Sequence, residues 1–98
     1  MKKEVIVVKD IVRGTSTNAE GHSLYIAVDR AISNGRIVVL SLKSCTPMSS
    51  SFLNSSLGNL VDKYGFDTLK GHLLLTDYTP VMAANIKNYL TKLKEIVH

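Results

Sequence analysis

The run IVVLSL at residues 37–42 constrains the fold more than any other part of the sequence, because it is apolar at nearly every position. A surface helix or a half-exposed strand needs polar residues at regular intervals, and this run lacks them. Near-continuous apolar runs of this length are typical of strands that helices cover on both faces. We therefore predict that residues 37–42 form the central strand of an α/β sheet with helices on both of its faces.

The segments before this run change from a strand-like to a helix-like pattern. Residues 5–8 (VIVV) are β-branched and predict a short strand, which residues 11–12 extend. After the loop RGTSTN, Thr17 and Glu20 have the spacing of a capping box, in which each side chain bonds the other residue's free backbone N–H. The residues that then share one helix face are Leu24, Ala27, Val28, Ala31 and Ile32. The pair at residues 34–35 (NG) predicts the end of this helix.

Two more helices and one more strand are predicted after the central run. The helical spacing of the second helix is carried by Leu53, Leu57, Leu60, Val61 and Tyr64. Gly65 predicts its end, and residues 72–78 (HLLLTDY) predict a strand. Thr79 and Pro80 are typical of a helix start. The apolar stripe of the third helix consists of Met82, Ile86, Tyr89, Leu90, Leu93 and either Ile96 or Val97.

The order strand, helix, strand, helix, strand, helix predicts an α/β fold with a small mixed or mostly parallel sheet flanked by about three helices. A chain of 98 residues holds one hydrophobic core, so we expect residues 1–98 to form a single domain. If the strands are parallel, the loops RGTSTN, SCTPMSSS and TDYT lie together at the carboxyl edge of the sheet. Open α/β sheets usually place their binding sites at that edge.

The middle loop belongs to a hydroxyl-rich segment, SCTPMSSSFLNSSLG, at residues 44–58. Serine is a favoured helix N-cap and typically stabilises a helix by about 1 kcal/mol, so a cluster of serines is expected at this helix start for structural reasons alone. A helix start also offers unpaired N–H groups and a partial positive charge, which could hold an anion on Ser50 or Ser51. The residues alone are compatible with two roles for these serines, which are helix capping alone and regulated phosphorylation.

The segment IVVLSLKSCTPMSSSFLNSSLGNLV at residues 37–61 resembles the STAS-like domains of unknown function. In that family an apolar strand and a short loop lead to a Ser-Phe pair that opens a helix, and a glycine follows. Ser51, Phe52 and Gly58 match these positions. The segment is also distantly similar to the STAS domains of anti-sigma factor antagonists, whose loop has the type Asp-Ser-Ser/Thr-Gly-Leu. The residues at the corresponding positions are Ser49, Ser50, Ser51, Phe52 and Leu53.

The resemblance to the antagonists implies a protein-interaction module of a signalling circuit. In those proteins a partner kinase phosphorylates one loop serine, and phosphorylation releases the complex. The resemblance therefore implies a kinase-like ATPase as the protein partner. The candidate partner-binding or phosphoacceptor residues are Ser49, Ser50, Ser51, Phe52 and Asn54. We expect the partner surface to combine residues 47–54 with the exposed side of the second helix, formed by Asn54, Ser55, Asn59, Asp62 and Lys63.

Enzymatic chemistry has little support in the sequence. Cys45 could act as a nucleophile only if a base and a positive environment lowered its pKa, and the nearest histidines in sequence are His22 and His72. A buried small thiol at a strand end is the commoner outcome. His22 and His72 lack a second ligand at i+3 or i+4, so metal-ligand spacing is absent. The glycines do not have the spacing of a phosphate-binding loop. We therefore expect a non-enzymatic protein with no catalytic residue, cofactor or metal.

The net charge of +4 raises the question of a nucleic-acid partner. The basic residues that could form one face are Lys2, Lys3, Lys9, Lys87, Lys92 and Lys94. Lysines opposite an apolar helix stripe are usually solvated, and no aromatic residues interleave with them as in a single-strand binding surface. The sequence thus favours a protein partner. The alternative is a small basic nucleic-acid-binding or regulatory protein, and a homodimer through a sheet edge or an apolar helix patch is a further option.

The start of the sequence bears on location. The only uninterrupted apolar run near it is residues 5–8, which is too short for the core of a signal peptide or for a membrane span. The single cysteine, Cys45, fits a reducing compartment. We therefore expect a cytoplasmic protein that does not enter a membrane.

Overall fold

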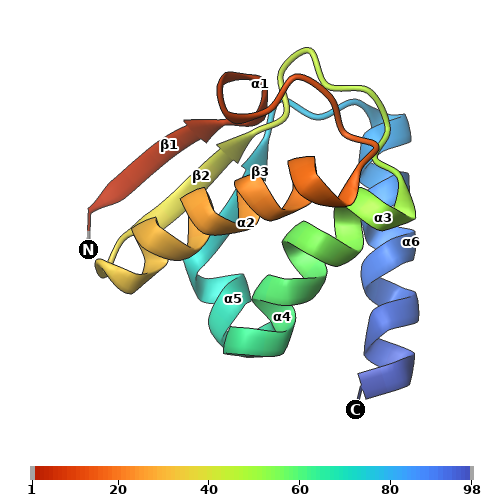
Figure 1. The fold of residues 1–98 in the computed structure, drawn as a ribbon. Coiled ribbons are helices and arrows are strands. Elements are labelled where there is room, and N and C mark those ends of the chain that lie inside the picture. Colours follow the sequence, from red (N-terminus) through yellow and green to blue (C-terminus); the bar gives the residue numbers. More distant parts are fainter. Residues whose placement is uncertain (1, 98) are drawn as a thin grey trace.

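The computed structural model describes residues 2–97 (Figure 1). The strands are β1 (Lys3–Val7), β2 (Ile37–Ser41) and β3 (Leu73–Thr76). The helices are α1 (Val8–Ile11), α2 (Asn18–Ser33), α3 (Ser50–Leu53), η1 (Asn54–Gly58), α4 (Asn59–Tyr64), α5 (Phe66–His72) and α6 (Pro80–Val97). Within these residues, no helix combines the length and the apolar character that a membrane span requires.

The three strands form one parallel sheet in the order β1-β2-β3. β2 is the central strand, as its apolar run predicts. Its Val39 lies opposite Val5 of β1 and Leu74 of β3, and its Leu40 lies opposite Ile6 of β1 and Leu75 of β3. The predicted α/β class and the parallel sheet are therefore confirmed.

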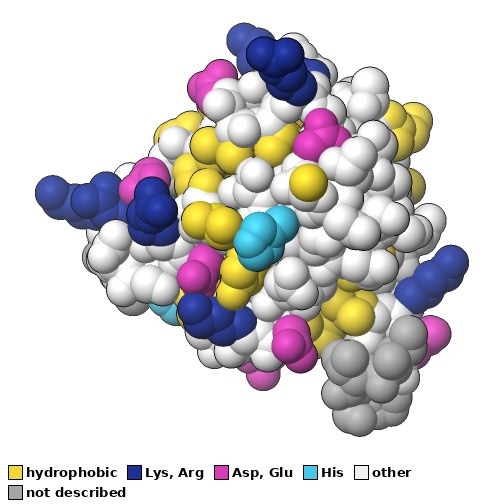
Figure 2. Space-filling view, in the orientation of Figure 1, with side chains coloured by type: hydrophobic (Ala, Val, Ile, Leu, Met, Phe, Trp, Pro, Cys, Tyr) yellow, Lys and Arg dark blue, Asp and Glu magenta, His cyan; other side chains and the backbone are white. Residues whose placement is uncertain are grey.

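One face of the sheet is covered by α2 and by the continuous helix α3–η1–α4. Both connections step along the sheet in the same direction, and right-handed crossovers then place their helices on the same face. Figure 1 shows α2 and α4 together on the near side of the strands. The side chains buried between these helices and the sheet include Ile6, Leu24, Val28, Val38, Leu40, Phe52, Leu53 and Leu60. Figure 2 shows the outside of this layer, where apolar areas are small and separated by polar and charged side chains.

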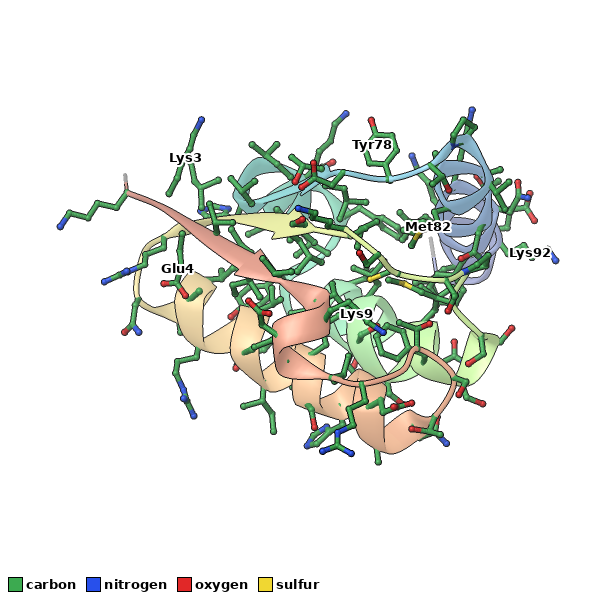
Figure 3. All side chains as sticks on the ribbon, turned by 90° about the horizontal axis from the view of Figure 1, so that it is seen from above. Lys3, Glu4, Lys9, Tyr78, Met82 and Lys92 are labelled. Atoms are coloured by element: carbon green, nitrogen blue, oxygen red, sulfur yellow. The ribbon has the colours of Figure 1, made fainter. Side chains whose placement is uncertain are left out.

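The opposite face of the sheet is largely open, so the prediction that helices cover β2 on both faces is wrong. Val5 and Leu74 lie on this face beside Val39 of β2, and their side chains are 67% and 44% exposed. Figure 3 shows Lys3 and Tyr78 on this side, away from α2, whereas Glu4 points to the α2 side. Among the described residues, α6 does not connect two strands of the sheet and does not cover this face. It instead buries Met82 and Ile86 at the side of the molecule.

Two local predictions also need correction. Residues 11–12 do not extend β1, because Val8–Ile11 form the helical turn α1, whose carbonyl at Val8 accepts the N–H of Val12 at 3.0 Å. This turn buries Val8 and Val12 while the chain leaves the sheet. The third strand begins at Leu73 and not at residue 72, because Phe66–His72 form the unpredicted helix α5. Gly65, with a φ of 83°, separates α4 from α5.

The predicted starts and ends of the main helices are confirmed. Thr17 and Glu20 form the complete capping box of α2, with the Glu20 N–H donating to Thr17 Oγ1 at 3.1 Å. The Thr79 hydroxyl accepts the N–H of Met82 at 3.2 Å, and α6 begins at Pro80 as predicted. These caps are local signals, so the sequence contains all that is needed to form them.

A polar cluster connects α2 to α4 on the surface. The Tyr64 hydroxyl donates to the Asp29 carboxylate and lies 3.1 Å from the Ser33 hydroxyl, and the Lys63 ammonium is 2.9 Å from the Asp29 carboxylate. The hydrogen bonds from Tyr64 and Lys63 lower the pKa of the Asp29 carboxyl below its ordinary value. The cluster therefore stabilises the contact between the helices when Asp29 is ionised.

Acidification should weaken this cluster. A carboxyl with a lower pKa in the folded chain stabilises the fold above the unfolded value of about 3.9, and the stabilisation is lost as the pH falls through the folded value. We expect Asp29→Asn to lower the free energy of unfolding by about 1 kcal/mol at neutral pH and to reduce its decline below about pH 4. Urea denaturation at neutral and acidic pH measures both effects. Asp62→Asn, at an exposed position of α4, is the control, and an Asp29→Asn profile parallel to the wild type would contradict the prediction.

Candidate functional site

The three predicted loops meet at the carboxyl edge of the sheet. The Thr15 hydroxyl of the first loop lies 3.2 Å from the Thr46 hydroxyl of the middle loop. The Ser41 hydroxyl, at the end of β2, donates to the Asp77 carboxylate after β3 at 2.6 Å. The parallel sheet thus brings together segments that are about thirty residues apart in sequence, because all strands end on the same side.

Ser49 is the N-cap of α3. Its hydroxyl accepts the N–H of Phe52 at 3.1 Å and donates to the carbonyl of Ser16 at 2.9 Å. Its own N–H donates to the carbonyl of Thr15 at 3.0 Å. The Ser49 hydroxyl therefore acts as both donor and acceptor in structural hydrogen bonds, and it connects the helix start to the loop that precedes α2.

Ser50 and Ser51 are the first two residues of α3, and both are exposed. Their hydroxyls have no hydrogen-bond partner in the part of the chain that the structure describes. Asn54, one turn further along, is also exposed, and its side-chain oxygen accepts the Tyr89 hydroxyl of α6 at 2.8 Å. Two hydroxyls and one amide thus lie on the surface at the start of the helix.

Phe52 is fully buried, with 0% of its surface exposed. It lies in the core beside Leu24, Leu53 and Leu60. A side chain without exposed surface cannot contact a partner. Phe52 therefore contributes to the site by anchoring the start of the helix in the hydrophobic core. The Ser-Phe pair thus combines an exposed hydroxyl with a buried anchor.

A π-helical turn, η1, follows directly after this pair. The flanking residues Leu53 and Asn59 have helical backbone angles, so α3, η1 and α4 form one continuous helix. Gly58 in this turn faces α6, since a Cβ at this position would lie 2.5 Å from the Tyr89 hydroxyl. The glycine of the sequence motif therefore makes room for Tyr89, which bonds Asn54. π-Turns within α-helices are frequent at functional sites, and the hydrophobic spacing gave no sign of this one.

The loop before Ser49 is also held by α6. The Asn85 side-chain oxygen accepts the N–H of Met48 at 2.8 Å, and the Asn85 amide donates to the carbonyl of Met48 at 3.1 Å. The sequence analysis did not identify Asn85. Asparagine has a low helix propensity, so its position inside a predicted helix was the available sign of a specific side-chain contact. With Ser49 bound to the first loop and Met48 bound to α6, the serines are presented on a fixed backbone.

A small hollow of about 190 Å³ lies beside Ser50. Its lining residues are Met48, Ser50, Leu53, Asn85, Asn88, Tyr89 and Lys92. Lys92 is the cation of this lining, and Figure 3 shows it on the outer side of α6. Burial raises the pKa of the Tyr89 hydroxyl, so it remains a donor to Asn54 at neutral pH. The hollow offers amides, a hydroxyl and one positive charge next to Ser50.

The predicted surface along the second helix is present in part. Asn59 and Asp62 are exposed as expected, whereas Ser55 is half-buried and donates to the Asn18 side chain at 3.0 Å. Lys63 is exposed but paired with Asp29. The residues of this helix that are open to a partner are therefore Ser50, Ser51, Asn54, Asn59 and Asp62.

The groups considered for catalysis are dispersed. Cys45 is half-buried, and burial raises the pKa of its thiol, which keeps it protonated at neutral pH. His22 is exposed on α2 with its ring stacked on Tyr25, and His72 ends α5. Across the described residues, no three His, Cys, Asp or Glu side chains are grouped to hold a metal ion.

A small parallel sheet whose central strand leads into a serine-capped helix defines an α/β module of STAS-like type. The family described as the STAS-like domain of unknown function matches residues 20–81, from the first turn of α2 to the start of α6. The chain belongs to this family. No curated protein and no solved structure matches the sequence.

Proposed function

We propose that this STAS-like domain is a non-enzymatic protein-interaction module whose partner binds the surface formed by Ser50, Ser51, Asn54, Asn59 and Asp62, and that phosphorylation of Ser50 or Ser51 releases the partner. The observation that carries the proposal is the division of roles among the three serines. Ser49 uses its hydroxyl for structure, while Ser50 and Ser51 present theirs to solvent. The distant similarity to anti-sigma factor antagonists supports a kinase-like ATPase as the partner.

The fold would tolerate a phosphate at either position. The first backbone N–H groups of a helix attract anions, and Lys92 lines the hollow next to Ser50. A phosphate on Ser50 is therefore stabilised by groups already present. It adds about two negative charges at neutral pH to a surface that contains Asp62, so the main effect falls on a partner docked there. Phosphorylation of Ser49 would instead disrupt two hydrogen bonds, which makes Ser50 and Ser51 the phosphoacceptors.

Binding of a purified kinase-like ATPase from the same cells tests this proposal. We expect the double variant Ser50→Asp, Ser51→Asp to bind at least about tenfold more weakly than the wild type, which corresponds to about 1.4 kcal/mol. Ser23→Asp, which adds one negative charge at an exposed site of α2, controls for charge placed away from the proposed surface and should bind like the wild type. Mass spectrometry after incubation with the kinase and ATP should show phosphate on Ser50 or Ser51. Equal binding by the double variant and unmodified serines would overturn the proposal.

The lysines considered for a nucleic-acid-binding face do not all lie together, although Lys87 and Lys94 line a common groove. Figure 3 shows Lys3, Lys9 and Lys92 in three separate regions of the molecule: the start of β1, α1 and the outer side of α6. Recognition of a phosphate backbone requires cations clustered on one face. This arrangement supports a protein partner over a nucleic acid. Salt-sensitive, submicromolar retention of oligonucleotides in a filter-binding assay would reverse this preference.

A further inference from the structure

A groove of about 620 Å³ lies between β3 and α6. Its apolar lining includes Phe66, Leu74, Tyr78 and Leu90. Tyr78 is 52% exposed and Leu74 is 44% exposed, which leaves large apolar side chains in contact with water. An exposed apolar groove of this kind is typical of a binding surface.

The groove follows the free edge of β3. Leu73, Leu74 and Leu75 all line it, although consecutive side chains of a strand point to opposite faces of the sheet. A groove that touches all three must therefore run along the edge between the faces. β3 is the last strand in the order β1-β2-β3, so within the described part of the chain no strand pairs with this edge. Such an edge can accept an additional strand from another chain.

The other wall of the groove is one face of α6. Ala83, Ile86, Lys87 and Leu90 line it at the three- and four-residue spacing of a helix face. Asn85, Tyr89 and Lys92 line the hollow beside Ser50 and lie on a different face of α6. The groove and the serine surface are therefore two separate regions on either side of one helix.

The charges around the groove indicate the chemistry of its occupant. The lining includes Lys70, Lys87 and Lys94, and none of its described residues is acidic. One acidic residue, Asp67, lies in an adjoining hollow of about 300 Å³. A second copy of this chain would bring the same lysines to the same place, and like charges oppose that pairing. Aspartate and glutamate side chains on an incoming segment would complement them.

We propose that an extended segment of a partner protein, with apolar residues alternating with aspartate or glutamate, adds to the edge of β3 and lies between β3 and α6. Its backbone pairs with the free edge of β3. Its apolar side chains contact Phe66, Leu74 and Leu90, and its carboxylates face Lys70 and Lys87. This surface is independent of Ser50 and Ser51, so one domain holds one partner through the groove while phosphorylation controls binding at the serines.

Selection from a display library of random nine-residue peptides tests the proposal on the whole chain. We expect enriched peptides to alternate apolar and acidic residues and to shift the amide NMR signals of β3 and α6. The double variant Lys70→Glu, Lys87→Glu should bind them at least about tenfold more weakly. Lys92→Glu, a single charge reversal on the other side of α6, is the control for position and should leave the affinity for these peptides unchanged.

Three results would overturn the proposal. The first is that no peptide is enriched, or that the enriched peptides are basic or uncharged. The second is that signals shift elsewhere and not along β3. The third is dimerisation through the groove, seen by sedimentation as a mass that rises with protein concentration while the signals of β3 shift without peptide. Binding of the kinase-like ATPase is measured separately with the Ser50 and Ser51 variants, so failure of either proposal leaves the other testable.

Discussion

Replacing Phe52 with alanine is expected to lower the free energy of unfolding by about 3–5 kcal/mol. Phe52 has no exposed surface and belongs to the core between the helices and the sheet, where it is among the largest fully buried side chains. Truncation removes most of the ring and leaves a cavity that the surrounding leucines fill only in part. Domains of this size are typically stable by about 5–15 kcal/mol, so much of the total is lost.

Urea denaturation followed by circular dichroism measures this change. Phe52→Leu retains much of the volume and should lose clearly less stability than Phe52→Ala. Ser51→Ala alters the neighbouring residue of the same motif at an exposed position and should change stability by less than about 0.5 kcal/mol. A loss of similar size in Phe52→Ala and Ser51→Ala would show that Phe52 is not the anchor of the helix start.

Local patterns of polar and apolar residues predicted the main helices correctly. Each of these patterns involves residues within one or two helical turns of each other, as in the capping box of Thr17 and Glu20, the Thr79 cap and the apolar faces of α2 and α4. The central place of β2 was also predicted, because residues 37–42 are apolar at nearly every position. The serine-capped helix start follows from the same kind of signal.

The number of layers could not be predicted, because an apolar position does not reveal what covers it. Val39 was interpreted as buried beneath a second helix layer, yet it lies on the open face beside Val5 and Leu74. A helix that connects two parallel strands is carried across the sheet, whereas within the described residues α6 leads to no further strand after β3. The exposed apolar residues of β1 and β3 are thus a consequence of the chain's connectivity.

The hydrogen bonds that hold the candidate site in place could not be predicted from the sequence either. Asn85 and Met48 are 37 residues apart, and Tyr89 and Asn54 are 35 residues apart. No periodicity connects residues at such distances, so only the folded chain shows that α6 fixes the serine loop. The space beside Gly58, in the π-turn at Asn54–Gly58, is likewise occupied by the hydroxyl of Tyr89 from α6.

Gly21 lies where α2 closely approaches the serine-capped helix, and its replacement is expected to have the second large effect on stability. A Cβ at residue 21 would collide with the carbonyl oxygen of Phe52 and would lie 2.9 Å from Cβ of Ser55. Backbone atoms cannot move aside as a flexible side chain can, so the two helices must separate. We expect Gly21→Ala to lower the free energy of unfolding by about 2 kcal/mol, although alanine favours a helix over glycine by about 1 kcal/mol.

Gly71→Ala is the matched control, because it makes the same substitution in α5 at an exposed position where nothing lies within 4 Å of the added Cβ. It should leave stability unchanged or raise it by up to about 1 kcal/mol. Opposite signs for the two variants in urea denaturation would show that close contact with Phe52, and not helix propensity, determines the residue at position 21. Because the contact involves the carbonyl of Phe52, Gly21→Ala should also broaden the amide NMR signals of Ser50 and Ser51. A stabilised Gly21→Ala variant with unchanged serine signals would mean that the helices do not meet at this point.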